Sequence, residues 1–235
     1  MIPSNFVQFF GFRMGEHLRR IKDLSVSGCQ NILPKHLLKA TAVMVMLETL
    51  DISDCPQFDS EDLLKIMGRL PILATINISK CKNMHGLIFD KLAKFSNLRR
   101  ICSSSNQQIQ SESVSRFLGS STNIKQICLS QSHIFKGMLT PFPLCASLDN
   151  LDVSSCGLTI VGCYIQFFFV VFSQLFQDFL AKLIESIPNL RTIACAHTKA
   201  KLPVHANAFF ANLSQIHSID VSFCTYVAFF LEKNT

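Results

Sequence analysis

Cysteine is the residue type in this sequence with the most reactive side chain, and its positions recur. The 235 residues include ten cysteines, and a thiol can bind a metal, form a disulfide or act as a nucleophile. Five of the ten occupy one position of a recurring pattern described below: Cys29, Cys55, Cys81, Cys156 and Cys224. No CxxC pair occurs, and no histidine accompanies this row. We therefore interpret the row as small buried side chains that turn the chain out of a strand, with a metal site or disulfide among Cys29, Cys55 and Cys81 as the alternative.

Carboxylates and serines recur as well, but not in catalytic combinations. Asp51, Asp152 and Asp220 share one position of the pattern, and serine takes another position in seven copies. No serine has a recurrent histidine neighbour that could activate it as a nucleophile. The chain also lacks the GxxxxGK[ST], GxGxxG, HExxH and GxSxG motifs. The sequence therefore predicts no catalytic residue, no metal ligand and no cofactor, and we expect the protein not to be an enzyme.

The pattern that organises these residues is nine residues long. It reads apolar-x-x-apolar-x-apolar-x-x-Cys or small polar, and its positions are numbered one to nine below. Successive copies begin 26, 26, 25, 26, 24, 42 and 26 residues apart. The eight copies start at Ile21, Leu47, Leu73, Leu98, Ile124, Leu148, Leu190 and Ile216. Such a fixed period predicts a solenoid of stacked repeats.

Each copy alternates apolar and polar residues, as a half-buried strand does. Helix-like stretches separate the copies. Ser60-Glu61-Asp62 begins one of them, with acidic residues in the first turn. The other stretches that we expect to be helical are 87–95, 113–118, 179–187 and 208–213. A strand and a helix in each repeat predict a parallel concave sheet with helices on its convex side.

The repeat resembles the cysteine-containing leucine-rich repeats of F-box/LRR proteins and related ribonuclease-inhibitor-like solenoids. The resemblance covers about residues 18–223 and rests on the ninth position, which is cysteine in five copies. Asn106, Ser132 and Thr198 occupy it in the other three. The resemblance implies an α/β leucine-rich-repeat solenoid of about eight repeats.

The polar strand positions flanking the central apolar residue should face away from the core. Asp51, Asn77, Arg100, Gln126 and Asp152 are the residues that we expect to contact a partner there. Acidic Glu48 and Asp149 share the second position with basic Lys22, Arg99, Lys125 and Arg191. The net charge is +6, and the basic residues are not clustered as nucleic-acid binding requires. A surface of mixed sign favours a protein or peptide partner over nucleic acid.

One long segment without charge interrupts the period. Residues 161–176 are rich in Phe and Val, and they lengthen one repeat to 42 residues. Three interpretations stay open. A membrane-spanning helix needs about 20 apolar residues, and an inserted loop would expose several Phe side chains. The third is a translated intron, because removing about 16 residues restores the 26-residue period.

These observations set the expected domain organisation. We expect an N-terminal segment or partial repeat at 1–17 and one solenoid at 18–235 with the anomalous insertion at about 161–176. We also expect the solenoid to be incomplete at its ends, because the last copy is followed by only eleven residues, several of them apolar. The start of the chain shows no basic, apolar signal sequence, so we expect a protein of the cytoplasm or nucleus that is not embedded in a membrane.

The resemblance also implies a function, namely substrate recognition for a cullin-type ubiquitin ligase. No F-box is found in this chain, so a Skp1- or elongin-type adaptor and a cullin would bind through a region absent from it. The alternative is an LRR scaffold or regulator outside ubiquitin transfer, such as an assembly factor or a small-GTPase regulator. Both functions rest on a protein partner bound by the concave face.

Overall fold

The computed structural model describes residues 15–85, 87–132, 147–156, 188–194, 196 and 216–220. The apolar segment 161–176 and the expected helices at 179–187 and 208–213 lie outside these residues. So do residues 1–14 and 221–235 at the two ends.

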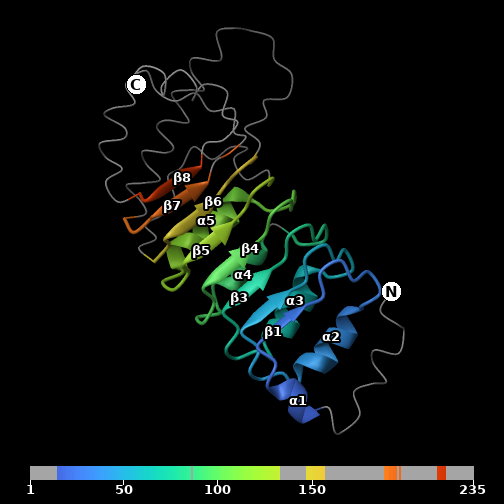
Figure 1. The fold of residues 1–235 in the computed structure, drawn as a ribbon. Coiled ribbons are helices and arrows are strands. Elements are labelled where there is room, and N and C mark those ends of the chain that lie inside the picture. The colour runs from blue at the N-terminus through green and yellow to red at the C-terminus, as the bar shows by residue number, and fades with distance from the viewer. Residues whose placement is uncertain are drawn as a thin grey trace, which may run out of the picture.

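One parallel sheet runs through the described residues. Its strands follow one another in chain order, each hydrogen-bonded to the next. They are β1 (Asp23–Ser25), β2 (Thr49–Asp51), β3 (Thr75–Asn77), β4 (Arg100–Cys102), β5 (Gln126–Cys128), β6 (Asn150–Asp152), β7 (Thr192–Ala194) and β8 (Ser218–Asp220). Every strand thus occupies positions three to five of a nine-residue copy. Figure 1 shows the strands as a single row from β1 to β8.

The register repeats from strand to strand without a slip. Leu24 pairs with Leu50, Leu50 with Ile76 and Ile76 with Ile101. The same fourth position continues through the remaining strands as Ile127, Leu151, Ile193 and Ile219. Equal positions of neighbouring repeats therefore lie side by side, in rows across the sheet.

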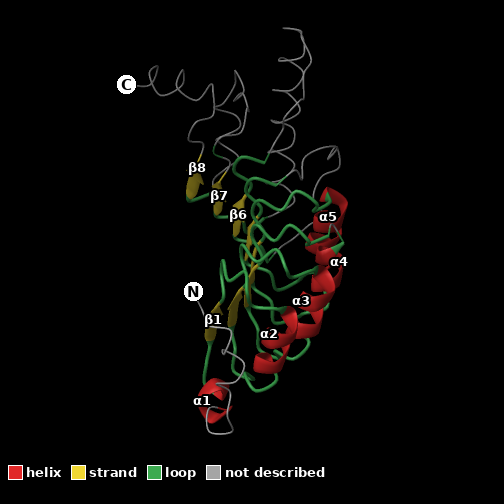
Figure 2. Cartoon of the chain, turned by 90° about the vertical axis from the view of Figure 1, so that its right-hand side faces the viewer, coloured by secondary structure: helices red, strands yellow, loops and turns green. Residues whose placement is uncertain are grey.

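A second layer on the other side of the core contains α2 (Pro34–Thr41), α3 (Ser60–Met67), α4 (Ile88–Leu92) and α5 (Ser111–Ser120). A short helix, α1 (Gly15–Arg19), precedes β1 at the N-terminal end of the described residues. Figure 2 shows α2 to α5 along the outer arc of the molecule and the strands along its inner arc. The repeat period predicts this arrangement, and the fold is an α/β leucine-rich-repeat solenoid.

Local sequence explains where two of the helices begin. Pro34 starts α2, where its missing N–H is not needed. Asp59 precedes α3, and its side chain accepts a hydrogen bond from the backbone N–H of Asp62 at 2.8 Å. The expected start of a helix at Ser60 is confirmed. The helix expected at 87–95 is shorter, Ile88–Leu92, and the one expected at 113–118 is longer, Ser111–Ser120.

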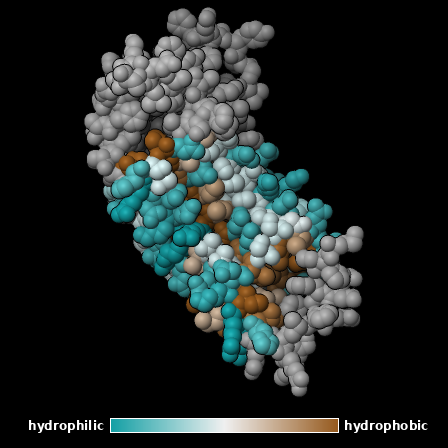
Figure 3. Space-filling view, viewed as in Figure 1, coloured by the Kyte–Doolittle hydropathy of each residue, from teal (hydrophilic) through white to brown (hydrophobic). Residues whose placement is uncertain are grey.

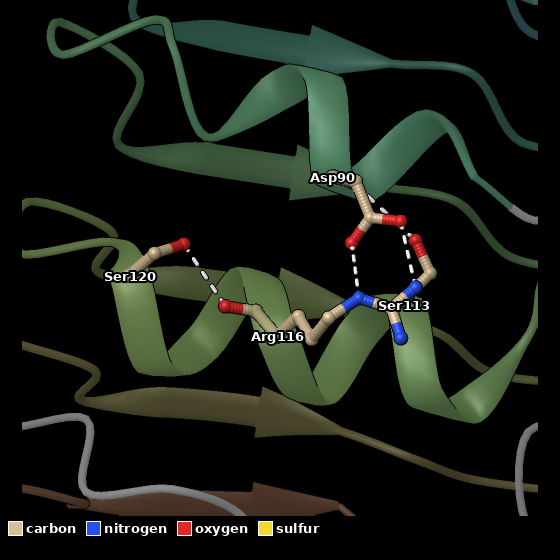
Figure 4. Close-up of polar contacts among 4 residues, drawn as sticks. All are labelled: Asp90, Ser113, Arg116 and Ser120. Atoms are coloured by element: carbon tan, nitrogen blue, oxygen red, sulfur yellow. Dashed lines mark hydrogen bonds and ion pairs between the residues drawn. The ribbon is translucent and has the colours of Figure 1, made fainter.

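Neighbouring helices are joined by a salt bridge and by aromatic packing. Arg116 of α5 donates two hydrogen bonds to the carboxylate of Asp90 in α4, at 2.9 and 2.8 Å. The backbone N–H of Asp90 donates to Ser113 Oγ at 3.3 Å, as Figure 4 shows. Beneath them, the rings of Phe89 and Phe117 meet edge to face with centroids 5.5 Å apart.

The core lies between the two layers and is built from equal positions of successive repeats. The first, fourth and sixth positions of the second repeat, Leu47, Leu50 and Ile52, are fully buried. Leu63 and Ile66 of α3 close the same layer of the core. Each repeat thus buries its apolar side chains against its own helix and the adjacent repeats, as a solenoid requires.

A left-handed turn follows each of the strands β1 to β6 at the eighth position. Its φ is +69° at Gly28, and it is between +53° and +60° at Asp54, Lys80, Ser105, Gln131 and Ser155. The N–H of each of these residues donates to the carbonyl of the seventh residue of the next repeat, for example Asp54 to Ser79 at 2.8 Å. The turn therefore sends the chain from the sheet toward the helix layer.

Candidate functional site

The five residues expected to contact a partner all lie on the inner, concave side of the sheet. Arg100 and Gln126 are the first residues of β4 and β5, and Asp51, Asn77 and Asp152 are the last residues of β2, β3 and β6. Each flanks a fully buried fourth position. Arg100 is exposed, and the other four are half-buried. Their burial agrees with the expectation that they flank the core on the concave side, and their contact with a partner stays a prediction.

The register brings some of these residues together and keeps others apart. Arg100 is the direct neighbour of Gln126, and Asp51 is the direct neighbour of Asn77. Asp152 lies three strands away from Asn77, with Cys102 and Cys128 between them in the same row. The five residues are therefore spread along the sheet rather than gathered in one pocket.

The carboxylates and the amide at the fifth position also hold the turn that follows. Asp51 Oδ1 accepts a hydrogen bond from the backbone N–H of Ser53 at 2.9 Å. Asn77 and Asp152 accept the equivalent bonds from Ser79 and Ser154, at 3.1 and 2.9 Å. An Asp or Asn side chain commonly bonds the backbone two residues ahead in this way. The sequence signal for this role is Asp or Asn followed two residues later by Ser.

The serine row at the seventh position forms hydrogen bonds between repeats. Ser27 Oγ lies 2.8 Å from Ser53 Oγ, and Ser130 Oγ donates to Ser104 Oγ at 2.9 Å. Ser79 Oγ accepts from the backbone N–H of Ser104 at 3.1 Å. In these contacts the serine hydroxyls bond to serines of neighbouring repeats, and none of the three contacts involves a histidine.

The buried cysteines described at the ninth position have a structural role, as the pattern predicts, and Cys224 lies outside the described residues. Cys55, Cys81 and Cys156 are buried, and each thiol donates to the sixth-position carbonyl of the preceding repeat, at 3.2, 3.1 and 2.9 Å. Asn106 and Ser132 make the same contact where cysteine is absent. Burial raises the pKa of Cys81 to about 11 and that of Cys156 to about 12. These thiols are therefore protonated at neutral pH.

A second group of cysteines behaves differently. Cys102 and Cys128 are adjacent in the fifth-position row and are half-buried rather than buried. The thiol of Cys128 donates to Asp152 Oδ2 at 3.0 Å and lies 3.1 Å from Ser104 Oγ. Sequence reasoning places both cysteines at an exposed position but misses their contact with Asp152. The signal was two cysteines at equal positions of consecutive repeats, followed by Asp in the next.

The charges at the edge of the concave face are of both signs. Lys22 Nζ lies 2.7 Å from Glu48 Oε1, and both side chains are exposed. Hydrogen bonding to Glu48 raises the pKa of Lys22. Arg99 donates to the carbonyl of Ser96 at 2.7 Å. Figure 3, which views the sheet side, shows hydrophilic and hydrophobic patches interleaved over the described strands.

Two searches of the described residues bear on other kinds of site. Within them, no three His, Cys, Asp or Glu side chains gather closely enough to hold a metal ion. None of the helices described there is both long and apolar enough to cross a membrane.

Comparisons of sequence return no match: no protein-family model matches the chain, and no curated protein does. Comparisons of structure return solved chains of low sequence identity. A chain of the Drosophila Toll–Spatzle complex matches over 95% of this chain and 31% of its own, with 12% identity and a TM-score of 0.45. This chain thus spans about a third of that Toll-complex chain.

Two further solved structures are similar in the same way. LegL7, a leucine-rich-repeat-containing protein from Legionella pneumophila, matches over 89% of this chain and 87% of its own, with 16% identity and a TM-score of 0.39. The functional domain of InlJ from Listeria monocytogenes matches over 89% of this chain and 55% of its own, with 13% identity and a TM-score of 0.34.

Proposed function

We propose that this protein is a protein-binding module whose concave sheet is the contact surface, and that it is not an enzyme. The observation that carries the proposal is the row geometry of the sheet. Equal positions of successive repeats lie side by side, so third- and fifth-position side chains form two continuous rows on the concave face, each residue exposed or half-buried. An extended face of this kind fits an extended protein surface or peptide.

The composition of the rows supports a protein partner. They combine a cation at Arg100, carboxylates at Asp51 and Asp152, and amides at Asn77 and Gln126. Such a mixture offers complementary contacts of both signs, whereas a phosphate backbone requires an excess of basic side chains. The partner is therefore a protein with its own mixed surface rather than a nucleic acid.

The finer proposal is that the module selects substrates for a cullin-type ubiquitin ligase in the cytoplasm or nucleus. Its support is the resemblance of the cysteine-containing repeat to F-box/LRR proteins. The adaptor, of the Skp1 or elongin type, and the cullin would bind through a region absent from this chain. A scaffold or regulator outside ubiquitin transfer would use the same concave face without these components.

A charge-reversal pair tests the binding surface. Arg100→Glu changes the exposed first residue of β4, and Lys91→Glu makes the same change on exposed Lys91 of helix α4. Both variants and the unaltered chain, tagged at the endogenous locus, are purified with their bound proteins and compared by quantitative mass spectrometry. We expect Arg100→Glu to reduce the specific partners at least tenfold and Lys91→Glu to retain them.

Three outcomes decide between the proposals. If both variants keep the same partners at equal amounts, the concave face is not the contact surface. If a cullin and its adaptor co-purify with the unaltered chain, the ligase function is supported. If the partners are lost only with Arg100→Glu, and no ligase component is among them, the scaffold function is supported in place of the ligase function.

A further inference from the structure

The thiols of Cys102 and Cys128 lie side by side in the middle of the concave sheet. Their residues are register partners at the ends of β4 and β5. Neighbouring strands are about 4.8 Å apart, which falls within the range of roughly 4.4–6.8 Å that Cα atoms of a disulfide span. Register partners also point to the same face of a sheet. Both cysteines are half-buried and free of any disulfide, so small molecules in solvent can reach their sulfurs.

Polar groups from three repeats surround the Cys128 thiol. Asp152 Oδ2 accepts a hydrogen bond from its thiol at 3.0 Å, and Ser104 Oγ lies 3.1 Å from its sulfur. Ser130 Oγ is 3.8 Å away and donates to Ser104 Oγ at 2.9 Å. We refer to Cys102, Cys128, Ser104, Ser130 and Asp152 as the thiol cluster.

The cluster makes the two thiols unequal. A hydrogen bond from Cys102 is the largest influence on Cys128 and lowers its pKa, and Ser104 lowers it further. Burial and Asp152 act in the opposite direction but do not outweigh these hydrogen bonds. The pKa of Cys102 is raised, first by the same hydrogen bond to Cys128 and then by burial. The lower pKa favours Cys128 over Cys102 as the thiolate of the pair.

The ninth-position thiols provide an internal contrast. Cys55, Cys81 and Cys156 are buried and donate to backbone carbonyls, and burial raises the pKa of each. Because the thiolate is the reactive form, these residues should react far more slowly than Cys128. The fold thus separates structural thiols in the core from an accessible pair on the concave face.

We propose that Cys102 and Cys128 are a redox-active pair that closes a reversible disulfide across β4 and β5 when a hydroperoxide is present. The Cys128 thiolate attacks the peroxide; the O–O bond breaks, an S–O bond forms, and hydroxide leaves and takes up a proton. Cys102 then loses its proton and attacks the Cys128 sulfur, so that the S–O bond breaks and the oxygen leaves as water. For hydrogen peroxide, the two thiols lose two electrons and two protons, and the peroxide becomes two waters.

Closure of the disulfide changes the surface as well as the sulfurs. Asp152 Oδ2 loses the thiol hydrogen bond and becomes available to another donor, while its Oδ1 still accepts from Ser154. Oxidation therefore alters Asp152, one of the five residues proposed to contact the partner. Only this consequence rests on the proposed function. The disulfide itself requires no partner, so the two proposals succeed or fail separately.

Peptide mapping tests the disulfide directly. The full chain is reduced, treated with an equimolar amount of hydrogen peroxide, alkylated and digested with trypsin. Cleavage after Arg100, Arg116, Lys125 and Lys136 places Cys102 in peptide 101–116 and Cys128 in peptide 126–136, each with no other cysteine. We expect these two peptides to be linked in more than half of the chains before Cys55, Cys81 or Cys156 is modified, and to separate on reduction with dithiothreitol.

Single variants identify the roles of the two thiols. Cys102→Ser removes the second thiol, so Cys128 should accumulate as a sulfenic acid that dimedone traps. Cys128→Ser should leave Cys102 largely unmodified at the same peroxide dose. Circular dichroism confirms that each variant is folded. The proposal is overturned if peroxide treatment leaves both thiols reduced. It is also overturned if either thiol forms a disulfide between chains rather than within one chain.

Asp152→Asn provides a second measurement that does not depend on disulfide closure. Asn77 occupies the same position and makes the same turn contact, so the change should preserve the fold. Removing the carboxylate lowers the pKa of Cys128 further, because a neighbouring negative charge opposes a thiolate. We expect Cys128 to react with iodoacetamide several times faster at pH 7, and Asp51→Asn, two strands from Cys102, to have no effect. An unchanged or slower reaction in Asp152→Asn would show that Cys128 is not the attacking thiol.

Discussion

At the scale of single residues, the fifth position of the repeat combines a turn contact with an exposed side chain. Asp51 Oδ1 accepts from the N–H of Ser53, while Oδ2 accepts from Ser25 Oγ at 3.3 Å on the surface. A substitution there therefore changes both the turn and the face presented to a partner. Asn77, which keeps the turn contact without a charge, shows how the two effects can be separated.

Leu50 and Asp51 are adjacent but should respond very differently to substitution. Leu50 is fully buried, so Leu50→Asp would place an unpaired carboxylate in the core and lower the free energy of unfolding by more than about 3 kcal/mol. Asp51→Asn keeps the hydrogen bond to Ser53 and should change stability by less than about 0.5 kcal/mol. Urea denaturation followed by circular dichroism measures both. Equal destabilisation by the two changes would contradict the assignment of the two faces.

Gly28 is the eighth-position residue whose turn should be most sensitive to substitution. Its φ is +69°, and a Cβ added there would meet no atom within 4 Å. Gly28→Ala therefore isolates backbone strain, which we expect to cost about 1 kcal/mol. The reverse change Lys80→Gly, at φ +60°, should not destabilise the protein by more than a few tenths of a kcal/mol, because lost strain offsets gained chain entropy. Thermal unfolding of both variants checks the pair, and a neutral Gly28→Ala would rule out the strain.

The alternation of apolar and polar residues along each strand is enough to predict which residues of the candidate site lie on the concave face. Asp51 and Arg100 flank buried positions in the sequence and do so in the structure. The contact between Cys128 and Asp152 could not be predicted in this way, because it depends on which rotamer each side chain adopts across two strands. The turn contacts of Asp51 and Asn77 were within reach of sequence reasoning, through the serine two residues later.

At the scale of the elements, α4 and α5 are joined by one bidentate salt bridge above one aromatic contact. Arg116→Lys would replace two parallel hydrogen bonds to Asp90 by a single point contact. The Arg116 side chain is 57% exposed, so solvent screens the pair, and we expect only a small loss of stability. Phe117→Ala, which removes a buried ring from the same pair of helices, should cost about 3–5 kcal/mol. Denaturant unfolding measures the free energy of unfolding of both variants. A larger loss from Arg116→Lys would show that the salt bridge contributes more to stability than the aromatic contact.

The salt bridge also makes a defined contribution to the pH dependence of stability. Hydrogen bonding to Arg116 is the largest cause of the lowered pKa of Asp90. A carboxyl group whose pKa is lower in the folded protein stabilises it above the unfolded pKa of about 3.9, and this stabilisation disappears as the pH falls through the folded pKa. The difference in stability between the unaltered chain and Arg116→Gln should therefore be constant near pH 7 and shrink below about pH 4. Unfolding curves at several pH values measure it, and a difference that grows on acidification would contradict the assignment.

Helix boundaries show the limit of sequence reasoning at this scale. Ser60 was predicted as a helix start because acidic residues follow it, and Asp59 supplies the cap. The region around 87–95 offers no comparable cap: Leu87 precedes α4 without a side-chain hydrogen bond. Its helix is set by packing of Ile88, Phe89 and Leu92 into the core, which a propensity argument does not contain.

At the scale of the whole molecule, the sheet keeps its register across the longest repeat. Leu151 of β6 pairs with Ile193 of β7 as equal positions pair elsewhere, although 42 residues separate the two copies. The additional residues therefore do not alter the ladder on either side. Deleting 161–176 restores the 26-residue period, and we expect the variant to unfold at the same or a higher temperature than the unaltered chain. A fall in the unfolding temperature of the variant would show that the segment contributes to the fold.

The pairing of each strand with the next also has a consequence for the order in which the protein can form during synthesis. Each described strand pairs with the strand of the next repeat, so the pairing of a repeat needs no segment far along the chain. A ribosome adds roughly 5–20 residues per second, so a new 26-residue unit emerges about every 1–5 s. Local helices and collapsed segments form in microseconds to a fraction of a millisecond. Each new repeat can therefore fold against the repeat that has already folded before it. A partly synthesised chain then exposes the apolar face of only its last folded repeat.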